Sequence, residues 1–329
     1  MEPTMEENSP EKSQGENQSF SLSFHGRGGT LLGIQIVNIL LMIITLGLYY
    51  FWAKAKVRRY IWGHTAFNGD RFTFHGTGEE TFSGWFKVIL VFGLPFLALQ
   101  NAPVLMGLDL WIQIVGLLLS GLLFLVLLPI AIVGTRRYRL SRTSLQGIRF
   151  SFRGKVKDFA KIFFACAGYL VITLGLYTPY YNMRSAAFLW KNSRFGNRSF
   201  GFDGEGKDLF WNFFLSRVLA IPTLGLALVW YYVIKTRYMW NHTTFEAARF
   251  KSTITFGGIL KLYIVNGLLT IVTLGFAFPW VVCRTNRYYL EHLTLEGGLD
   301  LSETVQDAQN TSAFGEEMGD FLDLDLDIG

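Results

Sequence analysis

The chain has little charge and almost no cysteine. Only 17% of its 329 residues are charged, whereas soluble domains carry about a quarter. The two cysteines, Cys166 and Cys283, have neither the number nor the spacing of a metal site or a disulfide framework. The first 30 residues also lack the basic start and short apolar core of a cleaved secretory signal. These absences disfavour a secreted, disulfide-stabilised protein and one built around a metal.

Apolar residues make up 50% of the sequence and gather in long runs. A hydrocarbon core of roughly 30 Å requires about 20 apolar helical residues. The runs predict six transmembrane helices, the second being the weakest because Gly93 and Pro95 interrupt it. The predicted spans are Thr30–Trp52, Phe86–Gln100, Leu110–Val133, Phe159–Tyr181, Leu209–Ile234 and Ile259–Val282. We expect a transmembrane domain over residues 20–301, between disordered acidic tails at 1–19 and 302–329.

The sequence repeats itself with a period of 50 residues. Thr-Leu-Gly begins at Thr173, Thr223 and Thr273, and an earlier copy begins at Thr45. Glycine after a helix favours the left-handed conformation that closes the last turn, so each apolar helix is expected to end there. Aromatic and then basic residues follow, which is typical of an amphipathic helix in the membrane interface. Short alternating segments around turns such as Asn68-Gly69 predict a β-hairpin in each unit.

The fold class predicted from these units is a mainly α membrane protein with about six transmembrane helices. Each unit contains an apolar helix, Thr-Leu-Gly, a basic interfacial helix and a short extramembrane β-hairpin. The segment Leu22–Gly26 resembles half of a unit ahead of the first span. Because only two cysteines occur and no ligand spacing recurs, we expect no cofactor and no metal site.

The orientation of the units follows from their basic residues. A unit with one span reverses direction at each repeat, so successive hairpins are expected on opposite sides. The loops 53–84, 135–158 and 235–258 contain 17 Lys and Arg, and the opposite side contains 9. The positive-inside rule then places these loops in the cytoplasm and both tails outside. Alternatively, all hairpins pair into one sheet on one side, which requires some apolar segments to be re-entrant.

The repeated motif resembles that of the YjgN-type family of bacterial inner-membrane proteins. The residues that carry the likeness are Thr45, Leu46, Gly47, Trp52, Arg58, Arg59, Tyr60, Thr65, Phe72, Phe74 and Gly76. The likeness covers about residues 20–329 and includes the acidic ending from Gly315 to Asp327. The second unit departs from the motif, because Ile130 stands in the place of the tryptophan. The resemblance implies a multi-pass protein of the bacterial inner membrane. That family's activity is unassigned, so no catalytic residue is carried over.

Polar residues inside the apolar runs are candidates for an intramembrane site. Asn38, Cys166, Ser216 and Asn266 each precede the threonine of their unit by seven residues, about two helical turns. They either line a polar path or hydrogen-bond between helices and hold the bundle together. Arg217 lies next to this column, where a charge either binds an anion or extends its side chain to the interface.

The basic segments are candidates for contact with anionic lipid headgroups, which attract juxtamembrane cations. The arginines chosen on this basis are Arg58, Arg59, Arg136, Arg137 and Arg237. No nucleic-acid-binding motif accompanies the charge. His64 and His242 occupy equal places, and a hydrogen-bonding role is favoured over metal ligation or titration near neutral pH. The pair Glu79 and Glu80 is better explained by a helix N-terminus than by catalysis.

Two functions remain open on the sequence alone. The first is a transport-like or small-ligand-binding helical bundle, because units of alternating direction resemble inverted-repeat transporters. The alternative is a structural protein that organises anionic lipids or partner proteins. A homo-oligomer is one assembly open to it. We do not expect an enzyme, because no nucleophile–base pair is evident.

Overall fold

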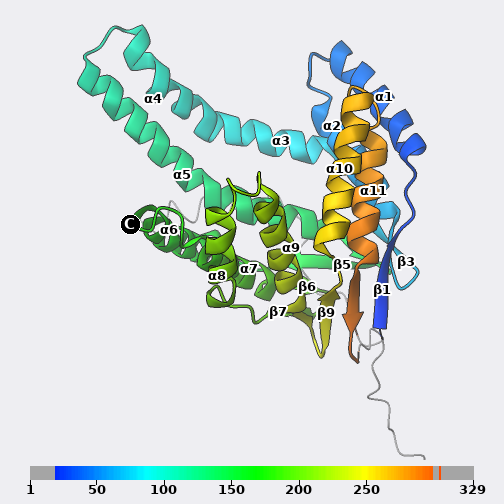
Figure 1. The fold of residues 1–329 in the computed structure, drawn as a ribbon. Coiled ribbons are helices and arrows are strands. Elements are labelled where there is room, and N and C mark those ends of the chain that lie inside the picture. Colours follow the sequence, from blue (N-terminus) through cyan, green and yellow to red (C-terminus); the bar gives the residue numbers. More distant parts are fainter. Residues whose placement is uncertain (1–18, 299–303, 305–329) are drawn as a thin grey trace, which may run out of the picture.

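The computed structural model describes residues 19–298 and residue 304. These residues form a ring of helical hairpins that stands on a small β-barrel (Figure 1). The predicted tails, 1–19 and 302–329, lie outside the described residues except for Ser19 and Thr304. The mainly helical character, the repeated units and the β-hairpins predicted from the sequence are confirmed.

Each unit contains two helical arms and two short strands. The first two units contain α1 (Gly28–Ile44), α2 (Tyr50–Gly63), β2 (Thr65–Phe67), β3 (Asp70–Phe74), α3 (Gly78–Val88), the π-helical turn η1 (Ile89–Gly93), α4 (Leu94–Leu105), α5 (Leu110–Ser141), β4 (Thr143–Leu145) and β5 (Ile148–Phe152). The others contain α6 (Val156–Ile172), α7 (Thr178–Lys191), β6 (Ser193–Phe195), β7 (Arg198–Phe202), α8 (Lys207–Val218), α9 (Leu226–Asn241), β8 (Thr243–Phe245), β9 (Ala248–Ser252), α10 (Phe256–Val272), α11 (Phe278–Glu291), β10 (Leu293–Glu296) and β1 (Ser19–Phe24).

Within the described chain, ten antiparallel strands close the barrel in the order β1-β10-β9-β8-β7-β6-β5-β4-β3-β2. A tight turn joins β2 to β3, and its residues Asn68 and Gly69 have the positive φ values, 49° and 95°, that such turns require. The first phenylalanine of each Phe-x-Phe pair packs in the core of the barrel, where the ring centroids of Phe150 and Phe195 are 4.7 Å apart. The second, such as Phe152 or Phe202, packs against the helices. Aromatic side chains therefore fill the barrel, which is a packed core.

The two ends of the described chain together form the fifth unit of the ring. Strand β1 pairs with β10 through Ser21 and Thr294, and with β2 through Leu22 and Phe67. Helix α11 packs against α1 in the same way that α2, α5, α7 and α9 pack against the helix that follows each of them. The half-unit predicted at Leu22–Gly26 is therefore the missing second strand of the fifth unit.

The Thr-Leu-Gly motif ends the first helix of a unit, as predicted, but it also reverses the chain. In the first unit, the backbone N–H of Gly47 donates to the carbonyl of Met42 (2.7 Å), and the Thr45 hydroxyl donates to the carbonyl of Leu41 (2.7 Å). The same hydroxyl accepts from the N–H of Tyr49 (3.0 Å), at the start of the returning helix. One threonine therefore links both helices of the hairpin.

This reversal overturns the predicted alternation of six spans. Four predicted spans, Thr30–Trp52, Phe159–Tyr181, Leu209–Ile234 and Ile259–Val282, are each broken by such a turn. Because all the strands join one barrel, every unit has its hairpin on the same side. The prediction took a long apolar run for one straight helix, whereas the run contains the bend of a helical hairpin. The alternative in which all hairpins pair on one side agrees with the structure.

The second unit is longer than the others. Among the described residues, two helical segments, Gly78–Leu105 and Leu110–Ser141, are long and apolar enough to cross a membrane. They form a hairpin that leans away from the ring (Figure 1). The predicted spans Phe86–Gln100 and Leu110–Val133 fall within these two segments. Gly93 and Pro95, which weakened the first of them on sequence, lie at the π-helical turn η1 and just after it.

The ring closure predicts a specific cross-link. Ser21→Cys combined with Thr294→Cys should form a disulfide on mild oxidation, because directly paired residues on antiparallel strands have Cα atoms about 4.5–5.5 Å apart. A shift in mobility on a non-reducing gel would detect it. The control pair, Ser199→Cys with Thr294→Cys, joins strands that do not pair and should stay reduced. Equal cross-linking of both pairs would contradict the strand order.

Candidate functional site

The turns of the four short hairpins carry exposed leucines. Leu46, Leu174, Leu224 and Leu274 are 93–95% exposed, with φ between 49° and 50°. A left-handed backbone costs roughly 1–2 kcal/mol in a residue with a Cβ atom. In water, each leucine therefore combines a strained backbone with a fully exposed apolar side chain. The arrangement is favourable only where an apolar phase surrounds the turn.

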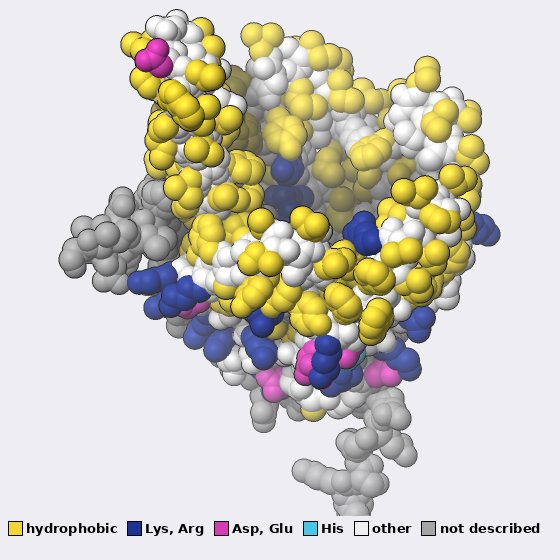
Figure 2. Space-filling view, turned by 60° about the vertical axis from the view of Figure 1, so that its left-hand side comes forward, with side chains coloured by type: hydrophobic (Ala, Val, Ile, Leu, Met, Phe, Trp, Pro, Cys, Tyr) yellow, Lys and Arg dark blue, Asp and Glu magenta, His cyan; other side chains and the backbone are white. Residues whose placement is uncertain are grey.

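A hollow opens between the helical hairpins, on the side away from the barrel. Figure 2 shows hydrophobic side chains over the projecting hairpins, Lys and Arg side chains around their base, and further basic side chains deep in the hollow. Below it, the ring centroid of Trp190 lies 5.6 Å from that of Phe200 and 5.5 Å from that of Trp240. The aromatic filling of the barrel therefore continues into the helices. The hollow therefore ends on a closed aromatic floor.

Arginines on α2 and α5 have different surroundings. Arg58 comes from α2, whereas Arg136 and Arg139 are one helical turn apart on α5. The guanidinium carbon of Arg136 lies 4.7 Å from the centre of the Trp190 ring, which places it at the edge of the aromatic floor. Burial, followed by the charge of Arg139, lowers the pKa of Arg58 below its ordinary value. For Arg58, burial and the charge of Arg139 therefore both oppose its own positive charge.

The other predicted lipid contacts lie elsewhere. Arg59 donates to the carbonyl of Gly76 (3.3 Å), and the buried Arg137 donates to that of Gly154 (3.1 Å). Arg287 makes the equivalent bond to Gly26 (3.1 Å) across the ring closure. Each of these bonds joins the second helix of one unit to the segment that leads into the first helix of the next. Arg237 occupies the same place in α9 and is exposed. Lipid contact by any of these residues stays a prediction.

The polar column is distributed around the ring. Asn38, Cys166, Ser216 and Asn266 are buried, and each lies in a different hairpin. The amide of Asn266 donates to the Thr285 hydroxyl on the returning helix (3.0 Å), and that of Asn38 points to the carbonyl of Ala53 (3.5 Å). These side chains join the arms of single hairpins and are not brought together into one site.

Arg217 is exposed near the end of α8, close to the turn of its hairpin. Its guanidinium carbon lies 4.8 Å from the centre of the Phe213 ring, one turn earlier on the same helix. The structure therefore gives this arginine a local aromatic partner and separates it from the arginines of α2 and α5.

The two predicted histidines end their helices. The Nδ1 atoms of His64 and His242 lie 2.8 Å from the carbonyls of Tyr60 and Tyr238, and each imidazole packs on that tyrosine's ring. His292 repeats the arrangement. Within the described residues, no group of three His, Cys, Asp or Glu side chains could hold a metal ion.

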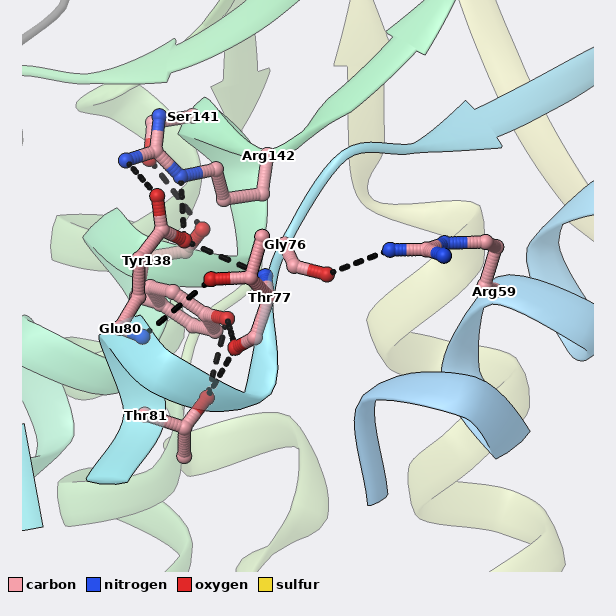
Figure 3. A network of polar contacts seen from close by, with 8 residues as sticks. All are labelled: Arg59, Gly76, Thr77, Glu80, Thr81, Tyr138, Ser141 and Arg142. Atoms are coloured by element: carbon pink, nitrogen blue, oxygen red, sulfur yellow. Dashed lines mark hydrogen bonds and ion pairs between the residues drawn. The ribbon is translucent and has the colours of Figure 1, made fainter. Parts of the chain in front are cut away.

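The second unit replaces this histidine by Arg142, which forms the polar network in Figure 3. Its guanidinium donates to both carboxylate oxygens of Glu80, at 2.7 and 3.0 Å. Glu80 also forms a reciprocal capping box with Thr77 at the start of α3. The pair Glu79 and Glu80 thus serves a helix N-terminus, as the sequence suggested. The Arg142–Glu80 ion pair fixes the base of the long hairpin.

Sequence reasoning missed the turn leucines and Arg139 as candidates. The leucines carried a signal, because the central residue of Thr-Leu-Gly is leucine in all four copies and lies in the middle of an apolar run. Arg139 carried none. Its equivalents in the other units are Ile61, Leu189, Met239 and Tyr289, so only the packing of α5 against its neighbours reveals its surroundings.

Comparison with known proteins gives one family. The model described as "Bacterial protein of unknown function (DUF898)" matches residues 19–227 and 217–321. The protein named Inner membrane protein YjgN of Escherichia coli (strain K12) is 36% identical over 158 residues, which are 48% of this chain and 37% of that protein. The protein of that name from Salmonella typhimurium (strain LT2) is 30% identical over 159 residues, 48% and 38% of the two chains. The matches thus span less than two fifths of these relatives' length. No solved structure matches.

The ion pair in Figure 3 predicts that the neighbouring Glu79 and Glu80 contribute unequally to the free energy of unfolding. Glu80→Gln should lower the free energy of unfolding by about 1–3 kcal/mol, because it removes a charge-assisted bond and leaves the half-buried Arg142 without its counter-charge. Glu79→Gln changes the formal charge equally at an exposed position and should have little effect. Thermal unfolding of both variants in detergent measures the difference. Equal losses would show that the ion pair does not stabilise this junction.

Proposed function

This chain belongs to the DUF898 family of bacterial proteins, and from that premise we propose that it is an inner-membrane protein that engages anionic lipid from one face of the bilayer. The apolar ends of its hairpins enter the membrane, and the barrel with its surrounding arginines stays at the surface. The observation that carries the proposal is the set of exposed leucines at the four short hairpin turns. Burying a leucine side chain in an apolar phase contributes about 1.5–3 kcal/mol, which offsets the backbone strain at each turn.

The lengths of the helices set the proposed depth of insertion. Helix α1 has 17 residues and is about 26 Å long, and α2 has 14 residues and is about 21 Å long. Neither reaches across a hydrocarbon core of roughly 30 Å. Helix α5, with 32 residues, is about 48 Å long and reaches across easily. The proposed topology is four re-entrant hairpins beside one hairpin that crosses the membrane twice.

The distribution of charge sets the proposed orientation. The five turns between helical arms contain no Lys or Arg, at 45–49, 106–109, 173–177, 219–225 and 273–277. Most of the described basic residues counted for both sides in the sequence instead lie on the strands, on the loops beside them or on the helix ends next to the barrel. The positive-inside rule therefore favours a cytoplasmic barrel. This reverses the expectation that the chain ends are outside, because β1 and β10 belong to the same barrel.

Transport is less well supported than it was on the sequence. The inverted-repeat argument required successive units to face opposite sides, but all five face the same side. The hollow between the hairpins also ends on packed aromatic rings, so it gives no continuous polar path through the barrel. Lipid engagement requires neither feature. The absence of enzymatic activity and the formation of a homo-oligomer stay predictions.

Fluorophores on single introduced cysteines test the topology. A label at Leu174→Cys should be quenched by nitroxides deep in the acyl chains and protected from aqueous iodide, because that turn ends inside the bilayer. A label at Asp109→Cys, at the turn of the long hairpin, should reach water on the far side. Ser199→Cys, exposed on the barrel, is the water-accessible control. Access of iodide to the label at residue 174 in intact proteoliposomes would refute the re-entrant proposal.

A further inference from the structure

The four short hairpins and the long hairpin end differently. The turns of the short hairpins contain no charged residue, whereas Asp109 lies in the turn of the long one. The helices of the short hairpins have 12–17 residues, and those of the long hairpin belong to segments of 28 and 32 residues. Only the long hairpin therefore has both the length to cross a hydrocarbon core of roughly 30 Å and a charged end suited to the water beyond it.

The tips of the short hairpins are apolar beyond their turn leucines. The last two residues of α1, α6 and α10 are Ile43-Ile44, Val171-Ile172 and Ile271-Val272, and all six side chains are 68–79% exposed. Transfer of these side chains from water into acyl chains is favourable. A tip of this kind is stable inside the hydrocarbon and not at the far water surface. In the proposed topology, the far leaflet therefore continues beneath the four short hairpins.

The inserted part of the ring is consequently wider on one side of the bilayer. All strands join one barrel, so every helical arm starts from the same side. The eight arms of the short hairpins end within the hydrocarbon, and only the two arms of the long hairpin continue into the far leaflet. A helix with its side chains is 10–12 Å across, so these eight arms add roughly 600–900 Å² of cross-section to the leaflet beside the barrel alone.

We propose that the four short hairpins form a wedge that bends the membrane, with the barrel on the convex side. Area added to one leaflet is accommodated when that leaflet takes the longer, outer surface of a curved bilayer. Binding by segments that enter one leaflet is sensitive to curvature for this reason. In the orientation proposed above, the membrane bulges toward the cytoplasm. This inference rests on the proposed function and adds to it the shape of the bilayer that the protein favours.

The orientation of the full chain in vesicles of two sizes tests the wedge. A fluorophore at Ser199→Cys marks the barrel, and vesicles formed by detergent removal are separated into small and large fractions. Iodide added outside quenches only barrels that face outward, and quenching after solubilisation gives the total. We expect a severalfold excess of outward barrels in small vesicles and nearly equal orientations in large ones. The same ratio in both fractions, or an inward excess in small vesicles, would overturn the proposal.

Replacing the tip leucines shows which part of the molecule is responsible. Leu46→Asn, Leu174→Asn, Leu224→Asn and Leu274→Asn together should abolish the outward excess, because the polar amides draw the tips out of the hydrocarbon. Asparagine tolerates the left-handed backbone of these positions. Each change alone should remove part of the excess, so the result does not depend on the folding of the fourfold variant.

The matched control is Leu105→Asn, at the end of α4. Leu105 is 84% exposed and lies next to the turn of the long hairpin, so its replacement should leave the outward excess unchanged. An excess that survives in the fourfold variant would assign the preference to the bulk of the barrel and would overturn the wedge.

Failure of the wedge and failure of insertion give different results. Access of iodide to a label at residue 174 in intact vesicles means that the short hairpins are not inserted, and both proposals then fail. A label at residue 174 that stays protected, together with the same orientation ratio in small and large vesicles, means that the hairpins insert without bending the bilayer. The wedge alone is then wrong.

Discussion

Four of the six apolar runs bend at a threonine that bonds to both helices of its hairpin, and this bend decides where the rest of the molecule lies. Thr45 caps the carbonyl of Leu41 and the N–H of Tyr49 at once, and Thr173, Thr223 and Thr273 repeat the bonds. Backbone groups that enter an apolar phase must be satisfied within the segment. The threonine does this at the point where a helix would otherwise expose its end. A chain that turns there returns to its starting side, and its strands can then meet in one barrel.

The barrel and the helical ring stabilise each other. Strands of three to five residues are too short to form a stable isolated hairpin. Here they share a core in which Phe72, Phe150 and Phe200 pack side by side, and Trp62 and Trp190 extend that packing into the helices. Closure by β1 leaves no edge strand among the described residues. The cooperative unit is therefore the whole ring, and no single repeat buries a sufficient core alone.

Local features of the fold could be predicted from the sequence, and its long-range arrangement could not. The period, the helix end at Thr-Leu-Gly, the turn at Asn68-Gly69 and the half-unit at Leu22–Gly26 depend on neighbouring residues, and all were identified correctly. Topology depends on whether 23 apolar residues such as Thr30–Trp52 form one helix or two, and hydropathy is the same in both cases. The surroundings of the arginines depend on which helices the closed ring brings together. Arg136 lies against Trp190 and Ser193 of the third unit. Arg59 and Arg137 instead donate to backbone carbonyls.

The second unit shows how one repeat acquires a different task. It lacks Thr-Leu-Gly, and its arms lengthen enough to cross the bilayer. Arg142 and Glu80 form an ion pair at its base, whereas the first, fourth and fifth units have a histidine at this position and the third has Asn192. The same helix, α5, also carries Arg136 and Arg139. A length sufficient to cross a membrane and an ion-paired base therefore coincide in one hairpin.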